Sequence, residues 1–147
     1  MKKIWLILIA GIAVYGFVQQ APKFFPIGKF FSSELSTSDK ALEKALKNNQ
    51  SNIQVGGSGK VIKILPDDTQ GSRHQKFIIE LNSGQTLLIS HNIDVARKID
   101  NLNVGDHINF YGEYEWNSKG GVVHWTHHDP SGRHEGGWLN HGGKIYQ

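Results

Sequence analysis

The sequence predicts a mainly β protein with one or two short helices, arranged as a five-stranded OB-like barrel behind an N-terminal hydrophobic leader. Three observations predict this class. The 147 residues allow one ordinary globular domain. From residue 53 onward, short stretches rich in Val, Ile and Phe alternate with Gly, Asn and Asp turn signals. The resulting order, strand-strand-strand-helix-strand-strand with a long glycine-bearing first strand, is typical of an OB barrel.

Residues 1–21 are predicted to be a signal peptide or an uncleaved signal anchor. Lys2 and Lys3 precede an uncharged run over residues 4–18, which is shorter than the roughly 20 residues of a spanning helix and fits a signal peptide. The cleavage signal is poor, because Val18 occupies the −3 position and Pro22 would follow the cut. Both alternatives place the body in the periplasm or outside the cell, anchored to the inner membrane by residues 4–18 if the leader stays.

Residues 22–51 are predicted to form a tether and a short helix. Residues 22–36 mix aromatics with Pro and Ser and show no period. A helix is expected from residues 36–38 to the Asn48-Asn49 pair, with Ala41, Leu42 and Ala45 on its apolar stripe. The OB-like, histidine-rich domain then occupies residues 52–147.

The elements of that domain follow from alternation and turn signals. Residues 66–71 and 82–84 carry the strongest turns. Residues 129–147 are rich in glycine, so we expect an ordered loop over the barrel. The predicted strands are residues 55–65, 76–81, 86–90, 107–115 and 122–127, with a short helix over residues 92–99 between the third and the fourth.

Charge and cysteine content exclude two classes. Lys and Arg number 16 against 13 Asp and Glu, and without the two leader lysines the balance is 14 against 13, which argues against a strongly cationic nucleic-acid binder. The absence of cysteine excludes a disulfide scaffold and limits any metal site to His, Asp, Glu and Asn ligands.

Eight histidines, the main functional signal, all lie at or after position 74: His74, His91, His107, His124, His127, His128, His134 and His141.

The densest cluster is the segment His124-Trp125-Thr126-His127-His128. On a strand, His124, Thr126 and His128 would share one face, while Trp125 on the other face would anchor the strand in the core. The histidines then either bind a divalent metal, form ordinary hydrogen bonds, or act in acid–base chemistry without a metal.

A second cluster lies at one end of the predicted hairpin. His74 and His91 should be neighbours there, with Arg73 beside the one and Asn92 beside the other. A hairpin histidine acting as general base, followed by an Asn or His that holds a metal at a helix start, is the plan of the ββα-metal nucleases. The alternative is that Asn92 and its neighbours simply cap the helix.

Carboxylates and aromatics complete the candidates. Glu113 and Glu115 would share a face beside the strand that carries His124, so acids and imidazole would converge there. Asp67, Asp68 and Asp106 fit turns. Arg133 could clamp a phosphate or form a structural ion pair. Among aromatics that could stack bases or sugars, most fit the core, and Tyr114 and Trp116 are the better candidates for exposure.

These motifs resemble a bacterial family of short exported proteins classed as a domain of unknown function and marked by an HWTHH motif. The resemblance covers residues 55–147 and rests on these segments: 65–68, 73–77, 91–94, 112–116 and 124–128. It implies an envelope or secreted location and one small domain, and brings no activity.

The leading functional hypothesis is an exported, divalent-metal-dependent phosphodiester hydrolase, a nuclease acting on DNA or RNA. The metal identity stays open among Mg²⁺, Mn²⁺, Ca²⁺ and Zn²⁺. The alternative is a non-catalytic OB-type envelope module that binds a metal, an oligosaccharide or a protein, although no protein partner is evident; periplasmic metal buffering is a third reading. The expected catalytic residues are His74, Arg73 and Glu113, the expected metal ligands are His91, Asn92, His124, His127 and His128, and the expected substrate contacts are Gln75, Trp116 and Arg133.

Overall fold

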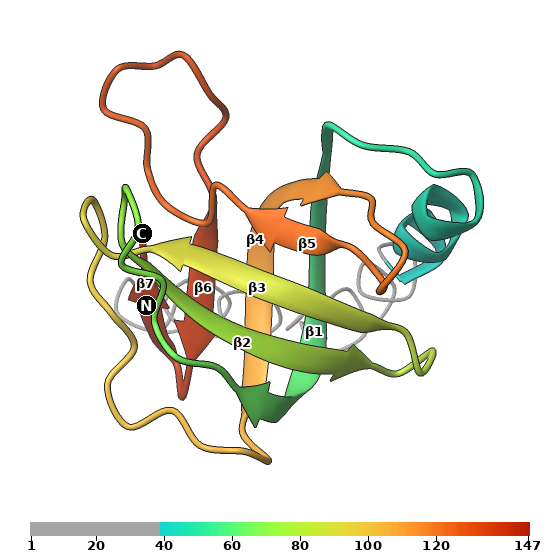
Figure 1. The fold of residues 1–147 in the computed structure, drawn as a ribbon, viewed down its shortest axis with the longest axis horizontal. Coiled ribbons are helices and arrows are strands. Elements are labelled where there is room, and N and C mark those ends of the chain that lie inside the picture. The colour runs from blue at the N-terminus through green and yellow to red at the C-terminus, as the bar shows by residue number, and fades with distance from the viewer. Residues whose placement is uncertain (1–38) are drawn as a thin grey trace, which may run out of the picture. The chain divides into compact units, whose positions relative to one another are not determined.

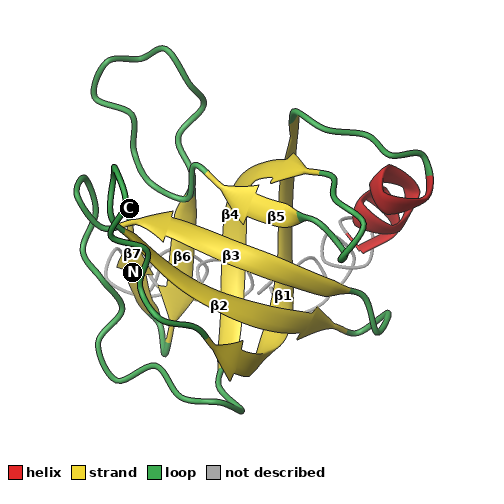
Figure 2. Cartoon of the chain, in the orientation of Figure 1, coloured by secondary structure: helices red, strands yellow, loops and turns green. Residues whose placement is uncertain are grey.

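Five strands close into a barrel, and two more extend its sheet. In the computed structural model, which describes residues 39–147, a helix over residues 39–47 precedes β1 (Ile53–Ile64), β2 (His74–Leu81), β3 (Thr86–Asn92), β4 (His107–Glu115), β5 (Val122–His124), β6 (Trp138–His141) and β7 (Lys144–Tyr146). The sheet order is β1-β2-β3-β5-β4-β6-β7, and pairing of β1 with β4 closes the barrel (Figures 1 and 2). The predicted mainly β fold and five-stranded barrel are confirmed.

The long first strand serves two neighbours. Its first part, from Ile53 to Lys60, pairs antiparallel with β4, and its second part, from Gly59 to Ile64, pairs with β2. The register with β2 shifts between Val61 and Lys63. Such an irregularity bends a strand and increases its twist, so β1 passes from one side of the barrel to the other.

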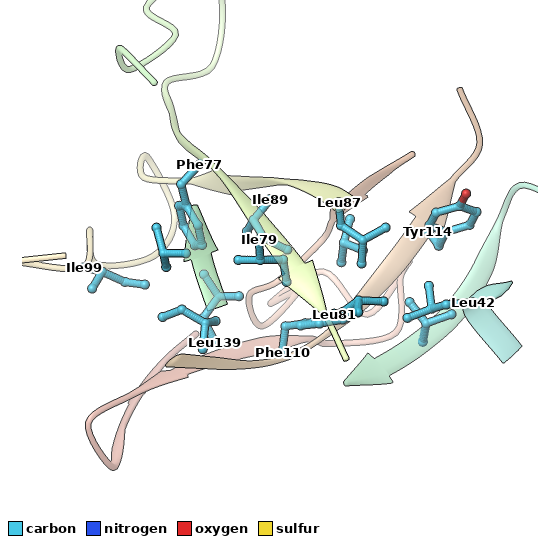
Figure 3. Close-up of a cluster of buried hydrophobic side chains, with 14 of the residues drawn as sticks. Leu42, Phe77, Ile79, Leu81, Leu87, Ile89, Ile99, Phe110, Tyr114 and Leu139 are labelled. Carbon is cyan, nitrogen blue, oxygen red and sulfur yellow. The ribbon is translucent and has the colours of Figure 1, made fainter. Parts of the chain in front are cut away.

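Alternating side chains of the strands fill the barrel. Every second residue of β2, β3 and β4 is buried, as expected for strands with one face on a core. Leu42 and Ala45 of the helix join this core, as the predicted apolar stripe requires, whereas Ala41 of that stripe is exposed. Tyr114, which we expected to be exposed, is fully buried in it. Figure 3 shows the largest members: Leu42, Phe77, Ile79, Leu81, Leu87, Ile89, Ile99, Phe110, Tyr114 and Leu139.

The predicted helix over residues 92–99 is wrong. This segment consists of turns and irregular chain. It makes one helical bond, from Ala96 N to Asn92 O (3.2 Å), and barrel side chains bind the backbone that follows. The Gln75 amide donates to Ile99 O (3.0 Å) and accepts from Ile99 N (2.9 Å). The carbonyl of Arg97 accepts from the ring of buried His91 (3.1 Å). These contacts tie residues 97–99 to the barrel end.

The predicted loop over residues 129–147 is also wrong in its second half. There, β6 pairs with β4, and β7 pairs with β6 across a two-residue turn. Gly142 and Gly143 form this turn with φ values of 57° and 83°, the left-handed conformation that a tight hairpin requires and that glycine adopts without strain. The Gly-Gly pair between two short apolar stretches was the signal for this hairpin.

Strand β5 is shorter than predicted. It ends at His124, because Trp125 has a left-handed φ of 53° and turns the chain away from the barrel. Residues 125–137 then form a loop that stands out from the barrel before β6 begins (Figure 1). The predicted strand geometry for residues 124–128, with Trp125 as a core anchor, is therefore wrong.

The predictions for the leader, the tether and the start of the helix concern residues 1–38 and lie outside the described residues. Within residues 39–147, no helix has the length and apolar character needed to cross a bilayer.

Gly112 sets how closely β4 approaches β5. A Cβ at this position would lie 2.5 Å from the carbonyl oxygen of His124 and 2.9 Å from Thr126 Cγ2. Backbone cannot move aside as a flexible side chain can, so Gly112→Ala should lower the free energy of unfolding by about 2 kcal/mol in urea titrations. Gly136→Ala is the matched control, since a Cβ there meets only ordinary contacts beyond 3.7 Å. Equal stability of the two variants would contradict this role of Gly112.

A candidate metal site on the outer face of β4 and β5

Three potential ligands converge where β4 pairs with β5. Because Tyr114 points into the core, its neighbours Glu113 and Glu115 point outward. Glu113 pairs with His124 in the antiparallel register, so both side chains lie on the same face. The predicted convergence of acids and imidazole on one surface is confirmed for these residues.

The distances within this cluster are too long for hydrogen bonds and short enough for a shared cation. His124 Nε2 lies 3.6 Å from Glu113 Oε1 and 3.7 Å from Glu115 Oε1. One ligand atom of each residue lies within 4.8 Å of the other two. The side chains are partly shielded, with exposed fractions of 29% for His124, 19% for Glu113 and 44% for Glu115.

Polar atoms on both sides of Glu113 are buried and unsatisfied. Among the described residues, three buried side-chain polar atoms lack a hydrogen-bond partner, and two of them are His124 Nε2 and Gln54 Nε2. Gln54 pairs with Glu113 across β1 and β4, so Gln54, Glu113 and His124 form one row across three strands. Buried polar groups are rarely left unpaired. The two unpaired atoms of this row, Gln54 Nε2 and His124 Nε2, can therefore each bond to a further group.

His134, from the loop that leaves β5, fixes the other oxygen of Glu113. Its Nε2 lies 2.7 Å from Glu113 Oε2, and its Nδ1 lies 2.8 Å from the carbonyl of Glu135. Both partners are acceptors, so both ring nitrogens donate and the ring is an imidazolium. Burial opposes this charge, but the bonds to the Glu135 carbonyl and to Glu113 outweigh it and raise the pKa of His134. The ring also stacks on Trp125, with centroids 4.0 Å apart.

Asp129 orders the same loop. Its carboxylate accepts hydrogen bonds from the hydroxyl and backbone N–H of Ser131 and from the backbone N–H groups of Arg133 and His134. These bonds lower the pKa of Asp129 to about 2. Arg133, a predicted substrate contact, is exposed on this loop, and its Nε donates to Ser131 Oγ. Asp129 therefore fixes the backbone of His134 within this loop.

His91 is buried and has no ring nitrogen available for a metal. Its Nε2 donates to the Arg97 carbonyl, and its Nδ1 accepts from the Thr126 hydroxyl at 2.8 Å, which is the pattern of a neutral imidazole. Burial is the main cause that lowers the pKa of His91 to about 4. The expected ligand is thus a structural link between β3 and the chain that follows β5.

Two of the three residues expected to carry catalysis, His74 and Arg73, lie apart from the carboxylates, whereas the third, Glu113, belongs to the cluster. His74 pairs with Asn92 in the register of β2 and β3, and its Nδ1 lies 2.7 Å from the Ser72 carbonyl. His91 pairs with Gln75 on the buried face, so His74 and His91 belong to opposite faces of the hairpin. Arg73 is held by Asp94, through its backbone N–H and its Nε, with distances of 2.8 and 2.6 Å. The expected base and its arginine therefore contact none of Glu113, Glu115 and His124.

Most of the remaining candidates make contacts within the fold. Asn92 Oδ1 accepts a hydrogen bond from Asp94 N in a turn. The Gln75 amide forms two hydrogen bonds with the backbone of Ile99. Trp116 is half-buried and packs against the core. His127 is buried, with its Nδ1 donating to the carbonyl of exposed His128. Of the five expected metal ligands, the structure brings only His124 to the carboxylates.

The two histidine clusters touch through the bond between His91 and Thr126, but this contact lies inside the barrel end, whereas His124 faces outward. Glu115 was expected on this face but not assigned as a ligand, and His134 was not expected at the site. Glu115 could be found from its spacing of two from Glu113. His134 could not, because nothing in the sequence shows how its loop folds back.

The buried neutral ring of His91 predicts a pH-dependent stability. Its pKa is about 4 in the folded chain and about 6.5 when unfolded, so protonation favours unfolding. Above about pH 6.5 the neutral His91 ring costs the folded chain no stability. As the pH falls from about 6.5 to about 4, the free energy of unfolding decreases by about 3 kcal/mol. His91→Gln should flatten this slope in urea titrations at a series of pH values. An unchanged slope would contradict the assignment.

The chain belongs to a family without an assigned function. The family model described as "Protein of unknown function (DUF3465)" matches residues 27–147, which extends the expected resemblance toward the N-terminus. A search of curated proteins finds no match. The match identifies the family and leaves the function to be argued from the site.

Proposed function

We propose that this DUF3465 chain is a divalent-cation-binding barrel whose ligands are Glu113, Glu115 and His124. The observation that carries the proposal is the buried, unpartnered Nε2 of His124, held 3.6 and 3.7 Å from two carboxylate oxygens. An imidazole nitrogen with an unused lone pair beside two carboxylates is a donor set that cations bind.

The donor set favours Zn²⁺ or Mn²⁺ over Ca²⁺ and Mg²⁺. The latter two prefer oxygen ligands alone, whereas imidazole suits the first-row transition metals and zinc. Bonds of about 2.0–2.2 Å around tetrahedral zinc separate neighbouring ligand atoms by about 3.3–3.6 Å. The two distances from His124 Nε2, 3.6 and 3.7 Å, lie at or just above the upper end of this range, so small side-chain rotations bring them within it.

The bond from His134 to Glu113 supports such a site. A carboxylate that binds a metal with one oxygen is usually held by a hydrogen bond at the other, which orients it and tunes its basicity. Here Glu113 offers Oε1 to the cluster while His134 holds Oε2 at 2.7 Å. The stack of His134 on Trp125 fixes that donor in turn.

A competing interpretation is a structural ion pair, in which His124 is an imidazolium between two carboxylates. The distances of 3.6 and 3.7 Å exceed those of a hydrogen bond from a ring N–H. An ion pair of this kind contributes little at a partly exposed position. The two interpretations differ in one property, metal affinity.

Calorimetric titration of the metal-free, untagged full chain with Zn²⁺ and Mn²⁺ tests the proposal. We expect one site with a Kd of about 1 μM or tighter, and at least tenfold weaker binding, about 1.4 kcal/mol, in His124→Ala and in Glu115→Gln. Exposed His107 and Glu80 lie outside the cluster, so His107→Ala and Glu80→Gln are the matched controls. Wild-type affinity in both cluster variants, with folding retained, would reject the site.

A second candidate function, an exported phosphodiester hydrolase acting on DNA or RNA, builds on the same ligands. Three protein ligands would leave a coordination position open to water, as in catalytic zinc sites, and a cation held there would lower the pKa of that water so that it could act as a nucleophile near neutral pH. The hydrophobic residues 4–18 behind Lys2 and Lys3 support export, with the barrel working in the periplasm, outside the cell or at the inner membrane.

The placement of His74 and Arg73 changes what this candidate predicts. Any hydrolysis should depend on the metal ligands and not on the hairpin histidine. Incubation of plasmid DNA and of RNA with the protein and Zn²⁺, Mn²⁺, Mg²⁺, Ca²⁺ or EDTA should give EDTA-sensitive cutting. We expect His124→Ala to lose that cutting and His74→Ala to keep it. Absence of cutting by the metal-loaded protein would leave a binding module as the function.

A further inference from the structure

Beside the cluster of Glu113, Glu115 and His124, the outer sheet face carries two rows of uncharged side chains. The first row contains Gly56 of β1, Tyr111 of β4 and Trp138 of β6, which pair across the strands. In the second row, Ser58 pairs with Asn109, Asn109 with Asn140, and Asn140 with Ile145 of β7. We call these two rows the aromatic–amide face.

Its centre is a pair of nearly parallel aromatic rings. Tyr111 and Trp138 have centroids 6.3 Å apart and planes that differ by 23°. Both rings are half-buried. Gly56 makes room for the first, since a Cβ there would lie 3.2 Å from Tyr111 Cδ2. The Tyr111 hydroxyl donates to Glu135 Oε1 at 2.6 Å, which fixes the ring. The pair is therefore a preformed aromatic stack.

The neighbouring row supplies hydrogen-bonding groups. Asn109 and Asn140 are half-buried side by side, with Ser58 at one end. Asn140 Oδ1 already accepts from Gly143 N in the β6–β7 turn, which fixes that amide and directs its NH₂ group to other partners. Ile145, 46% exposed, ends the row. Amides beside a rigid aromatic stack can bind a ligand that has both a nonpolar face and hydroxyl groups.

Charge around the face disfavours phosphate-bearing ligands. Neither row contains Lys or Arg, and Lys60 lies one row farther along β1. Two carboxylates flank Tyr111, those of Glu135 at its hydroxyl and of Glu113 two residues along β4. Binding to nucleic acid draws its strength from neutralised phosphates, so a flat face bordered by carboxylates favours a neutral ligand.

We propose that the aromatic–amide face binds a neutral oligosaccharide. The C–H face of a pyranose ring would stack on the outer face of Trp138, which Tyr111 supports from the other side, while Asn109 and Asn140 bond its hydroxyls. The free oxygen of Glu135 can accept from a further hydroxyl. This binding is independent of the cation proposed above, because none of its groups is a ligand of that site.

Titration with maltotetraose, cellotetraose and the β-1,4-linked N-acetylglucosamine tetramer tests the proposal. The full chain is kept in a detergent without a sugar headgroup, and binding is followed by calorimetry. At least one probe should bind with a Kd of about 1 mM or tighter, equally with and without EDTA. Trp138→Ala should weaken binding at least tenfold, whereas Trp138→Phe, which keeps a stacking ring, should stay within about threefold.

Asn109→Ala keeps the test decisive if Trp138→Ala fails to fold, with Asn82→Ala in an exposed turn as its control. We expect Asn109→Ala to weaken binding and Asn82→Ala to leave it unchanged. Three results would overturn the proposal: no binding of any probe at this level, wild-type affinity in folded Trp138→Ala and Asn109→Ala, or preference for an oligothymidylate over all three sugars. Zn²⁺ affinity is measured in the same Trp138→Ala protein. If it is unchanged, a loss of sugar binding cannot be caused by failure of the metal site.

Discussion

Strand β4 is the constraint on which the rest of the structure depends. One of its edges pairs with β1 and closes the barrel, and the other edge is divided between β5 and β6. The chain must therefore leave the sheet after His124 and return at Trp138, and the loop between them is a consequence of this divided edge. Gly112 stands at the division, where the carbonyl of His124 comes too close for any larger residue.

This arrangement gives the two faces of β4 different tasks. Ile108, Phe110 and Tyr114 point inward and hold the barrel together. The outward positions carry Asn109, Tyr111, Glu113 and Glu115, so one strand contributes to both the cation cluster and the aromatic–amide face. The histidines divide in the same way. Buried His91 ties elements together as a neutral ring, while His124 and His134 lie on the outer face beside Glu113.

Much of the barrel could be predicted from the sequence, because period-two alternation and turn residues act locally. The bounds of β4 agree at both ends, and the convergence of Glu113, Glu115 and His124 follows from spacing and hairpin pairing alone. The β6–β7 hairpin had a local signal in Gly142-Gly143 that the prediction missed. Two other errors arise where tertiary contacts override local pattern. Residues 92–99 have helical spacing, but Gln75 and His91 bind their backbone. Segment 124–128 reads as a strand, but Trp125 turns out of the sheet. No local signal shows that His134 returns to Glu113.

The most direct test of the central claim is the position of a bound cation. Anomalous diffraction from crystals of the protein grown with Zn²⁺ locates it without reference to any activity. The account predicts one peak about 2.0–2.2 Å from Glu113, Glu115 and His124, with His134 still bonded to Glu113. A peak at His127 and His128 instead, or none at the cluster in a zinc-saturated crystal, would contradict it.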